Sequence, residues 1–139
     1  NALNYERGVA GILMTDPNGG TIGGTLGSIM GRRINLIIPV GLEKNIATDI
    51  EDAAEALQES DEYIGVVPRL WPIRGNIVTE IEALNILTGV AAMQIGSGGV
   101  GGAEGSVRLL LDGTREVLDD TMRFLDEHVF GEPDFIKLE

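Results

Sequence analysis

The sequence predicts an α/β fold with a mainly parallel sheet and covering helices, built from two pseudo-symmetric β-(Gly loop)-α-β-α halves. A glycine-rich stretch occurs twice, and apolar runs of strand length alternate with amphipathic stretches. This alternation is typical of parallel strands joined by crossover helices. Because 139 residues suit one core, we expect a single domain, 1–139, with halves at roughly 1–65 and 76–130 and a C-terminal tail at 131–139.

The repeat aligns residues 20–30 with residues 98–108 without a gap. The shared positions are Gly20/Gly98, Gly23/Gly101, Gly24/Gly102, Gly27/Gly105 and Ser28/Ser106. Upstream, residues 2–12 resemble residues 83–93. One difference is chemical, because Glu104 of the second copy replaces Leu26 of the first. We expect the two stretches to be related by a pseudo-twofold axis.

In the first half, residues 8–15 are mostly apolar and end in turn formers, which predicts a buried strand. A short helix is expected over 22–33 and a second buried strand over 34–40. Residues 43–60 place Ile50, Ala54 and Leu57 on one face and acidic residues on the other, which predicts an amphipathic helix.

A strand is expected over 63–67, and two prolines hold the link 68–76 extended. In the second half, Asn76 is expected to cap a helix over 77–87. A strand at 90–95 then leads to the second glycine stretch. A strand at 107–111 precedes a helix at 114–129 that turns Leu118, Met122, Leu125 and Val129 inward.

The composition argues against several classes of protein. With 22 acidic and 10 basic residues, a net charge of −12, direct nucleic-acid binding by this segment is not expected. No apolar run reaches the roughly 20 residues of a membrane span, and no leader pattern is present, so we expect a cytoplasmic protein without a membrane partner. The start at Asn1 without Met indicates a fragment of a longer protein.

The glycine stretches are the leading candidates for ligand binding. Each is expected to follow a strand and open a helix, so that backbone N–H groups face an anion. The spacing matches neither a dinucleotide fingerprint nor a P-loop. The candidate ligand-binding residues are Gly19, Gly20, Thr21, Gly23, Gly24, Ser97, Gly98, Gly99, Gly101 and Gly102. Alternatively, glycines four residues apart, such as Gly23 and Gly27, let two helices pack closely.

Charged residues supply further candidates. Arg69 and Arg74 flank Trp71 and suit pairing with a carboxylate or phosphate, although they could instead neutralise nearby acids on the surface. Glu43 and Lys44 follow the second predicted strand, where open α/β sheets bind ligands. The alternative for Glu43 is helix capping.

Support for catalysis is thinner. An enzyme would need Glu43, Glu80 or Glu104 to converge beside a glycine stretch. His128 is expected to interact with a helix end, and no metal-ligand spacing is found, so no metal or cofactor is assigned.

Together these features predict a regulatory domain that senses a small anionic ligand, bound in a crevice between the two glycine stretches. The alternatives are an enzyme acting on a phosphorylated or carboxylated metabolite and an oligomerisation module without a ligand. Glycine-faced helices and the apolar Phe135 and Ile136 also predict a homo-oligomer.

Overall fold

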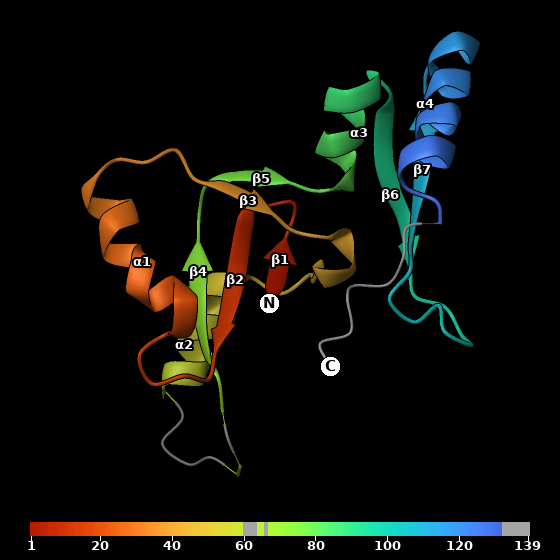
Figure 1. Ribbon diagram of the computed structural model, residues 1–139. Coiled ribbons are helices and arrows are strands. Elements are labelled where there is room, and N and C mark those ends of the chain that lie inside the picture. The colour runs from red at the N-terminus through yellow and green to blue at the C-terminus, as the bar shows by residue number, and fades with distance from the viewer. Residues whose placement is uncertain (60–63, 66, 132–139) are drawn as a thin grey trace, which may run out of the picture. The chain divides into compact units, whose positions relative to one another are not determined.

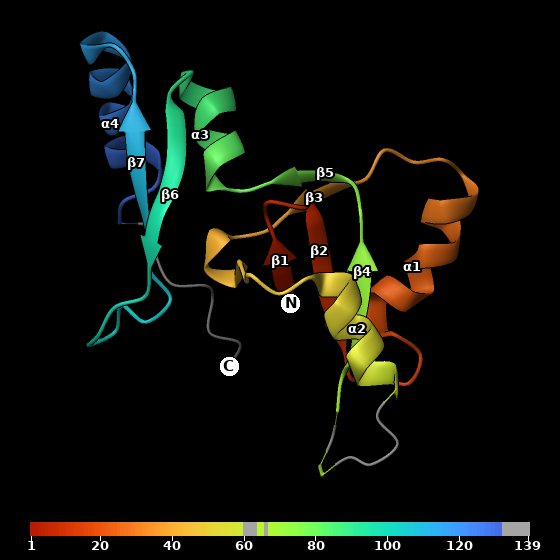
Figure 2. The same ribbon diagram turned by 180° about the vertical axis from the view of Figure 1, so that it is seen from behind.

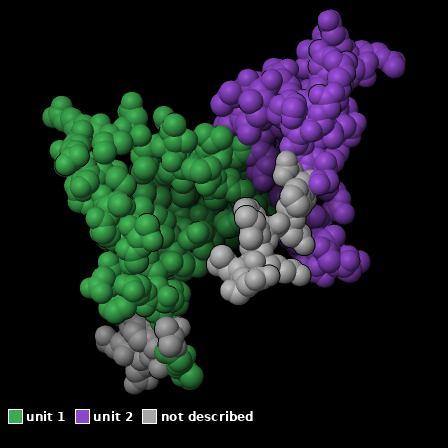
Figure 3. Space-filling view, in the orientation of Figure 1, with its two compact units in different colours: residues 1–79 green, residues 80–139 purple. Residues whose placement is uncertain are grey.

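The computed structural model describes residues 1–59, 64–65 and 67–131. It divides into two compact units, Asn1–Thr79 and Glu80–Glu139, which Figure 3 distinguishes by colour. Among the described residues, no helix is both long enough and apolar enough to cross a membrane.

The first unit is built on an antiparallel sheet (Figure 1). Its strands β1 (Ala2–Asn4), β2 (Val9–Met14) and β4 (Arg69–Ile73) lie in the order β1-β2-β4. Gly8 has a φ of 63° in the turn between β1 and β2, a conformation that glycine adopts without strain. In the β2-β4 pairing, Met14 lies opposite Arg69 and Ile12 opposite Trp71.

The helix α2 (Ile50–Glu59) covers one face of this sheet, as the view from behind shows (Figure 2). Val9, Ile50, Ala54 and Leu70 form its buried core cluster. The helix α1 (Gly20–Gly31) lies beside β4 in both views (Figures 1 and 2). Within α1, Ile22, Leu26 and Ile29 are half-buried at helical spacing.

A second pairing in this unit joins β3 (Ile37–Pro39) to β5 (Asn76–Val78) in parallel. The 3-10 helix η1 (Leu42–Lys44) follows β3, and its Leu42 is buried. Among the described strands this short ladder is the parallel one; the other pairings are antiparallel.

The second unit combines α3 (Glu80–Thr88), β6 (Ala91–Ser97), β7 (Val107–Asp112) and α4 (Arg115–His128). The strands β6 and β7 form an antiparallel hairpin with a register shift between Gln94 and Gly96. Thr114 caps α4 by accepting a hydrogen bond from the N–H of Val117 at 3.4 Å.

The predicted mainly parallel sheet is wrong. The strand at 34–40 shortens to β3 and does not join the main sheet, while the predicted link 68–76 contains β4, which runs antiparallel to β2. Although strands and helices alternate along the sequence, neighbouring strands of the main sheet are therefore not parallel. A strand over 2–4 was not foreseen, and it adds another antiparallel pair.

The predicted pair of equivalent β-(Gly loop)-α-β-α halves is also wrong. The first glycine stretch forms α1, whereas the second is the non-helical connection between β6 and β7. Leu26 continues the apolar stripe of α1, but Glu104 interrupts that stripe in the second copy. Positive φ angles at Gly98, Gly101 and Gly102 belong to the loop that reverses the chain.

Several local predictions are confirmed. Strands over 8–15, 90–95 and 107–111 appear as β2, β6 and β7, and the predicted helices appear as α1, α2, α3 and α4, although α2 begins at Ile50 rather than near residue 43. Two details are wrong. Asn76 lies in β5 rather than at a helix cap, and Met122 and Val129, both expected to face inward, are 46% and 47% exposed whereas Thr121 is fully buried on α4. The predicted strand at 63–67 and the tail at 131–139 lie partly outside the described residues.

Candidate functional site

A pocket of about 370 Å³ in the first unit lies between the turn that precedes α1 and strand β4. Gly19 and Gly23 line it from the glycine stretch, and Arg69 lines it from β4. The structure therefore brings together one predicted glycine stretch and one predicted arginine. It does so although 50 residues separate Gly19 from Arg69 in the sequence.

Strand geometry explains why Arg69 and Trp71 reach this pocket. Alternate side chains of a strand point to opposite faces, so Leu70 enters the core under α2 while its two neighbours face the other way. Trp71 remains 37% exposed. Leu26 of α1 lines the same pocket and gives it an apolar wall.

The turn before α1 carries its own carboxylate. Asp16 Oδ1 accepts hydrogen bonds from the N–H groups of Asn18 at 2.7 Å and Gly20 at 3.4 Å. Gly19 and Gly20 have φ angles of 78° and 58°, which lets the chain turn into the helix at this point. Asp16 thus binds the N–H of Gly20, which the sequence suggested for an external anion.

Thr21 and Gly24 do not line this pocket. Both are exposed on α1. A Cβ added to Gly24 or Gly27 would have no heavy atom within 4 Å. The described residues therefore contain no helix packed against these two glycines, as the close-packing alternative would require.

Arg69 and Arg74 have different surroundings. Arg74 donates to Glu51 at 2.8 Å. It lines a neighbouring hollow of about 400 Å³ that shares Leu26 and Trp71 with the first pocket. Among the described residues, by contrast, the guanidinium of Arg69 forms no ion pair within 4.0 Å. Within the described part of this region, Arg74 thus has an acidic partner and Arg69 has none.

Glu43 and Lys44 pair with each other on η1. The hydrogen bond from Lys44 lowers the pKa of Glu43, and partial burial opposes this effect. Neither residue lines the pocket beside Arg69. The charges of Glu43 and Lys44 are therefore paired with each other.

The second glycine stretch is held by hydrogen bonds within its own loop. The N–H of Gly98 donates to Ser106 O at 2.8 Å, and the hydroxyl of Ser106 donates to Gly98 O at 3.0 Å. Arg108 Nη1 also donates to Gly98 O, at 2.9 Å. Ser97 and Gly99 are exposed beside this junction.

Glu104 gives this loop an internal carboxylate as well. Its Oε1 accepts from the N–H of Gly102 at 3.3 Å. Hydrogen bonds from its own N–H and from that of Gly102 lower the pKa of Glu104. The two glycine stretches belong to different compact units, so no crevice between them is described.

The candidate catalytic acids are not brought together within one unit. Glu43 lies in the first unit, whereas Glu80 and Glu104 lie on α3 and in the β6-β7 loop of the second. Glu80 borders an apolar groove of about 440 Å³.

His128 is exposed at the end of α4, with its ring centre 5.0 Å from that of Phe124. In the described ranges, no group of three His, Cys, Asp or Glu residues could hold a metal ion.

Met14 and Leu26 were not singled out from the sequence as site residues, yet both line the pocket. The apolar spacing of α1 could have indicated Leu26. The position of Met14 opposite Arg69 depends on strand pairing. Comparison with protein-family models, curated proteins and solved structures gives no match.

Proposed function

We propose that this chain is a ligand-sensing domain that binds a small organic anion in the pocket between α1 and β4. Arg69 pairs with the anionic group, while Trp71 and Leu26 cover an apolar or planar part of the ligand. The observation that carries the proposal is the placement of Arg69, without an ion pair among the described residues, beside Trp71 and the glycine turn.

The net charge of −12 opposes an approaching anion at long range. Exposed charges are screened beyond a Debye length of about 8 Å at physiological ionic strength. A guanidinium, in contrast, makes short, directional hydrogen bonds to a carboxylate or phosphate. Local pairing with Arg69 therefore outweighs the distant acidic surface.

Binding is favoured over catalysis by the lining of the pocket. Asp16 is the carboxylate among its lining residues, and its Oδ1 atom already accepts hydrogen bonds from the turn. General acid-base chemistry needs a group that is positioned to exchange a proton with the ligand. The sequence also predicts self-association. That is a separate proposal, because all residues that line this pocket belong to the first unit of one chain.

The site can be tested with the intrinsic fluorescence of Trp71, the only tryptophan of the chain. Nucleotides, phosphorylated metabolites and dicarboxylates are titrated while this fluorescence is recorded, and thermal unfolding is followed in parallel. A true ligand at about 100 times its Kd should stabilise the protein by about 2.7 kcal/mol.

Arg69→Gln should weaken binding at least about tenfold, which corresponds to about 1.4 kcal/mol. Arg115→Gln is the matched control, since Arg115 lies on α4 in the other unit and its side chain is 93% exposed. The proposal is wrong if no anion changes the fluorescence of Trp71. It is also wrong if Arg69→Gln binds as tightly as the control.

A further inference from the structure

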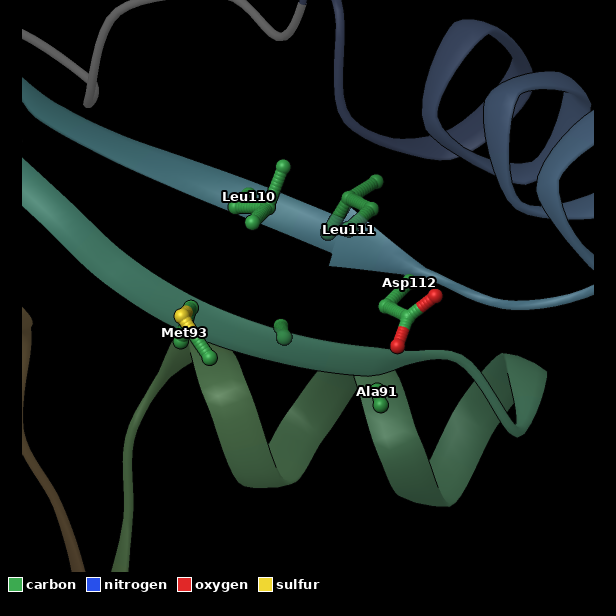
Figure 4. Close-up of a pocket in the computed structure, with 6 residues that line it drawn as sticks. Ala91, Met93, Leu110, Leu111 and Asp112 are labelled. Atoms are coloured by element: carbon green, nitrogen blue, oxygen red, sulfur yellow. The ribbon is translucent and has the colours of Figure 1, made fainter.

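The β6-β7 hairpin has an exposed apolar face. Its helix-facing residues Leu109 and Leu111 line the groove formed with α3 and α4. Leu110 points to the opposite face. On that face Met93, which lies opposite Leu110, is 57% exposed and Leu110 is 49% exposed. Figure 4 shows Met93, Leu110, Leu111 and Asp112 around a hollow of about 200 Å³ on these two strands, and the hollow therefore includes residues from both faces.

Two opposite charges bracket Leu110 on β7. Arg108, Leu110 and Asp112 are all exposed and alternate with Leu109 and Leu111, which are half-buried. Arg108 uses Nη1 to bind Gly98 O, and a guanidinium has five N–H donors, so others remain. Among the described residues, Asp112 forms no ion pair within 4.0 Å.

The pattern Arg-Leu-Leu-Leu-Asp over 108–112 is complementary to itself in the reverse direction. A twofold axis through Leu110 places Arg108 of one copy opposite Asp112 of the other, and it does so twice. A twofold interface uses the same surface on both subunits. In this antiparallel arrangement, each of Leu109, Leu110 and Leu111 lies opposite a leucine of the other copy.

The edge of β7 can accept another strand. Among the described strands, β7 pairs with β6 alone, so its second edge presents unpaired backbone groups. A two-stranded hairpin is also marginally stable by itself, and further strands stabilise it. Because Met93 lies opposite Leu110, pairing of two β7 strands would create a Met-Leu-Leu-Met row across four strands.

We propose that a second copy of this chain docks its β7 antiparallel to β7, centred on Leu110, and forms one continuous four-stranded sheet. Two Arg108-Asp112 ion pairs between copies set the register. This surface is independent of the ligand pocket in the first unit, so either proposal can fail without the other.

The full chain is tested by sedimentation equilibrium. The wild type should dimerise reversibly, while Arg108→Asp and Asp112→Arg should each raise the dimer Kd at least about tenfold, or about 1.4 kcal/mol. Each substitution places like charges opposite each other at two positions. Arg115→Asp is the control, because it makes the same charge change outside β7 and should leave the Kd unchanged.

An equimolar mixture of the two variants should dimerise as well as the wild type, because opposite charges then face each other at both positions. The double variant Arg108→Asp/Asp112→Arg should also dimerise, and circular dichroism checks folding. Because Arg108 is also replaced in this double variant, the double variant lacks the hydrogen bond from Arg108 to Gly98 O. A wild type that stays monomeric at its solubility limit overturns the proposal. So does a dimer that neither reversal weakens, or a mixture that associates no better than Asp112→Arg alone.

Discussion

The carboxylate of Asp16 lies 2.7 Å from the backbone nitrogen of Asn18 and accepts its hydrogen bond. Glu104 has a similar relation to Gly102 in the second glycine stretch. Both stretches therefore satisfy some of their N–H groups with a carboxylate from their own sequence. Asp16 and Arg69 both line the pocket beside the first stretch. Under the proposed function we therefore expect Asp16 to repel a bound anion and Arg69 to attract it.

This relationship predicts that Asp16→Asn strengthens anion binding in the pocket. Asn keeps an oxygen that can accept from the turn but removes the negative charge. Two like charges about 4 Å apart repel by roughly 1 kcal/mol in water, so we expect about fivefold tighter binding. Fluorescence titration of Trp71 measures the change. Asp119→Asn on α4 is the control, and unchanged or weaker binding by Asp16→Asn would contradict the prediction.

The glycines of α1 are expected to differ in their tolerance of a methyl group. A Cβ on Gly23 would overlap the carbonyl oxygen of Asn18, whereas a Cβ on Gly27 meets no heavy atom within 4 Å. Gly27→Ala should therefore stabilise the chain by about 0.5–1 kcal/mol through helix propensity. Gly23→Ala should destabilise it by about 1–3 kcal/mol through overpacking. Urea unfolding of the matched pair tests both values, and destabilisation by Gly27→Ala would indicate a partner packed on this face.

The sequence predicts local structure better than strand pairing. The helices α2 and α4 follow from apolar spacing within each segment. The partner of a strand depends on contacts between distant residues, and composition gives no direction for β4 relative to β2. Parallel pairing was inferred from alternation alone, and it applies only to β3 and β5 among the described strands.

The repeat shows how similar segments respond to context. Ala2-Leu3-Asn4 forms β1, whereas the identical Ala83-Leu84-Asn85 lies within α3. Yet Gly8 and Gly89 both have positive φ, 63° and 77°, directly before a buried valine. Turn geometry is retained where glycine permits it, but tertiary contacts decide between strand and helix.

The sequence indicated individual residues of the site but not which of them lie close together. Arg69 and the glycines at 19 and 23 were candidates from residue type, and the structure lines one pocket with them. Met14 joins them because β2 pairs with β4 at a separation of 55 residues, Met14 to Arg69. Arg74 lies just past the end of β4 and pairs with Glu51 of α2, a partner that sequence spacing does not indicate.

Asp49 is expected to make stability depend on acid pH. Its carboxylate accepts from the N–H of Glu51 at 2.7 Å, which chiefly lowers its pKa, and it also pairs with Arg7. A lowered folded-state pKa stabilises the protein above the ordinary aspartate pKa, and this contribution is lost as pH falls through the folded value. Asp49→Asn should therefore lower the free energy of unfolding at neutral pH and approach the wild type in acid.

Denaturant unfolding across this pH range measures the difference. Arg7→Gln is the comparison, because it removes the ion pair but keeps the hydrogen bonds from the start of α2. We expect a smaller pH-dependent loss from Arg7→Gln than from Asp49→Asn. An equal or larger loss would mean that the ion pair with Arg7, rather than the backbone hydrogen bond, sets the pKa.

Glu104 should be visible through the amide of Gly102. Since the backbone hydrogen bonds lower the pKa of Glu104, the Gly102 amide resonance should titrate with a midpoint below the ordinary glutamate value. The hydrogen bond is present above that midpoint and is lost as the carboxylate becomes protonated. Nuclear magnetic resonance of the full chain measures the midpoint. Glu104→Gln should abolish this titration while the hydrogen bond from Gly98 to Ser106 persists, because that bond does not involve the carboxylate. A Gly102 amide that titrates identically in Glu104→Gln would show that another acid controls the loop.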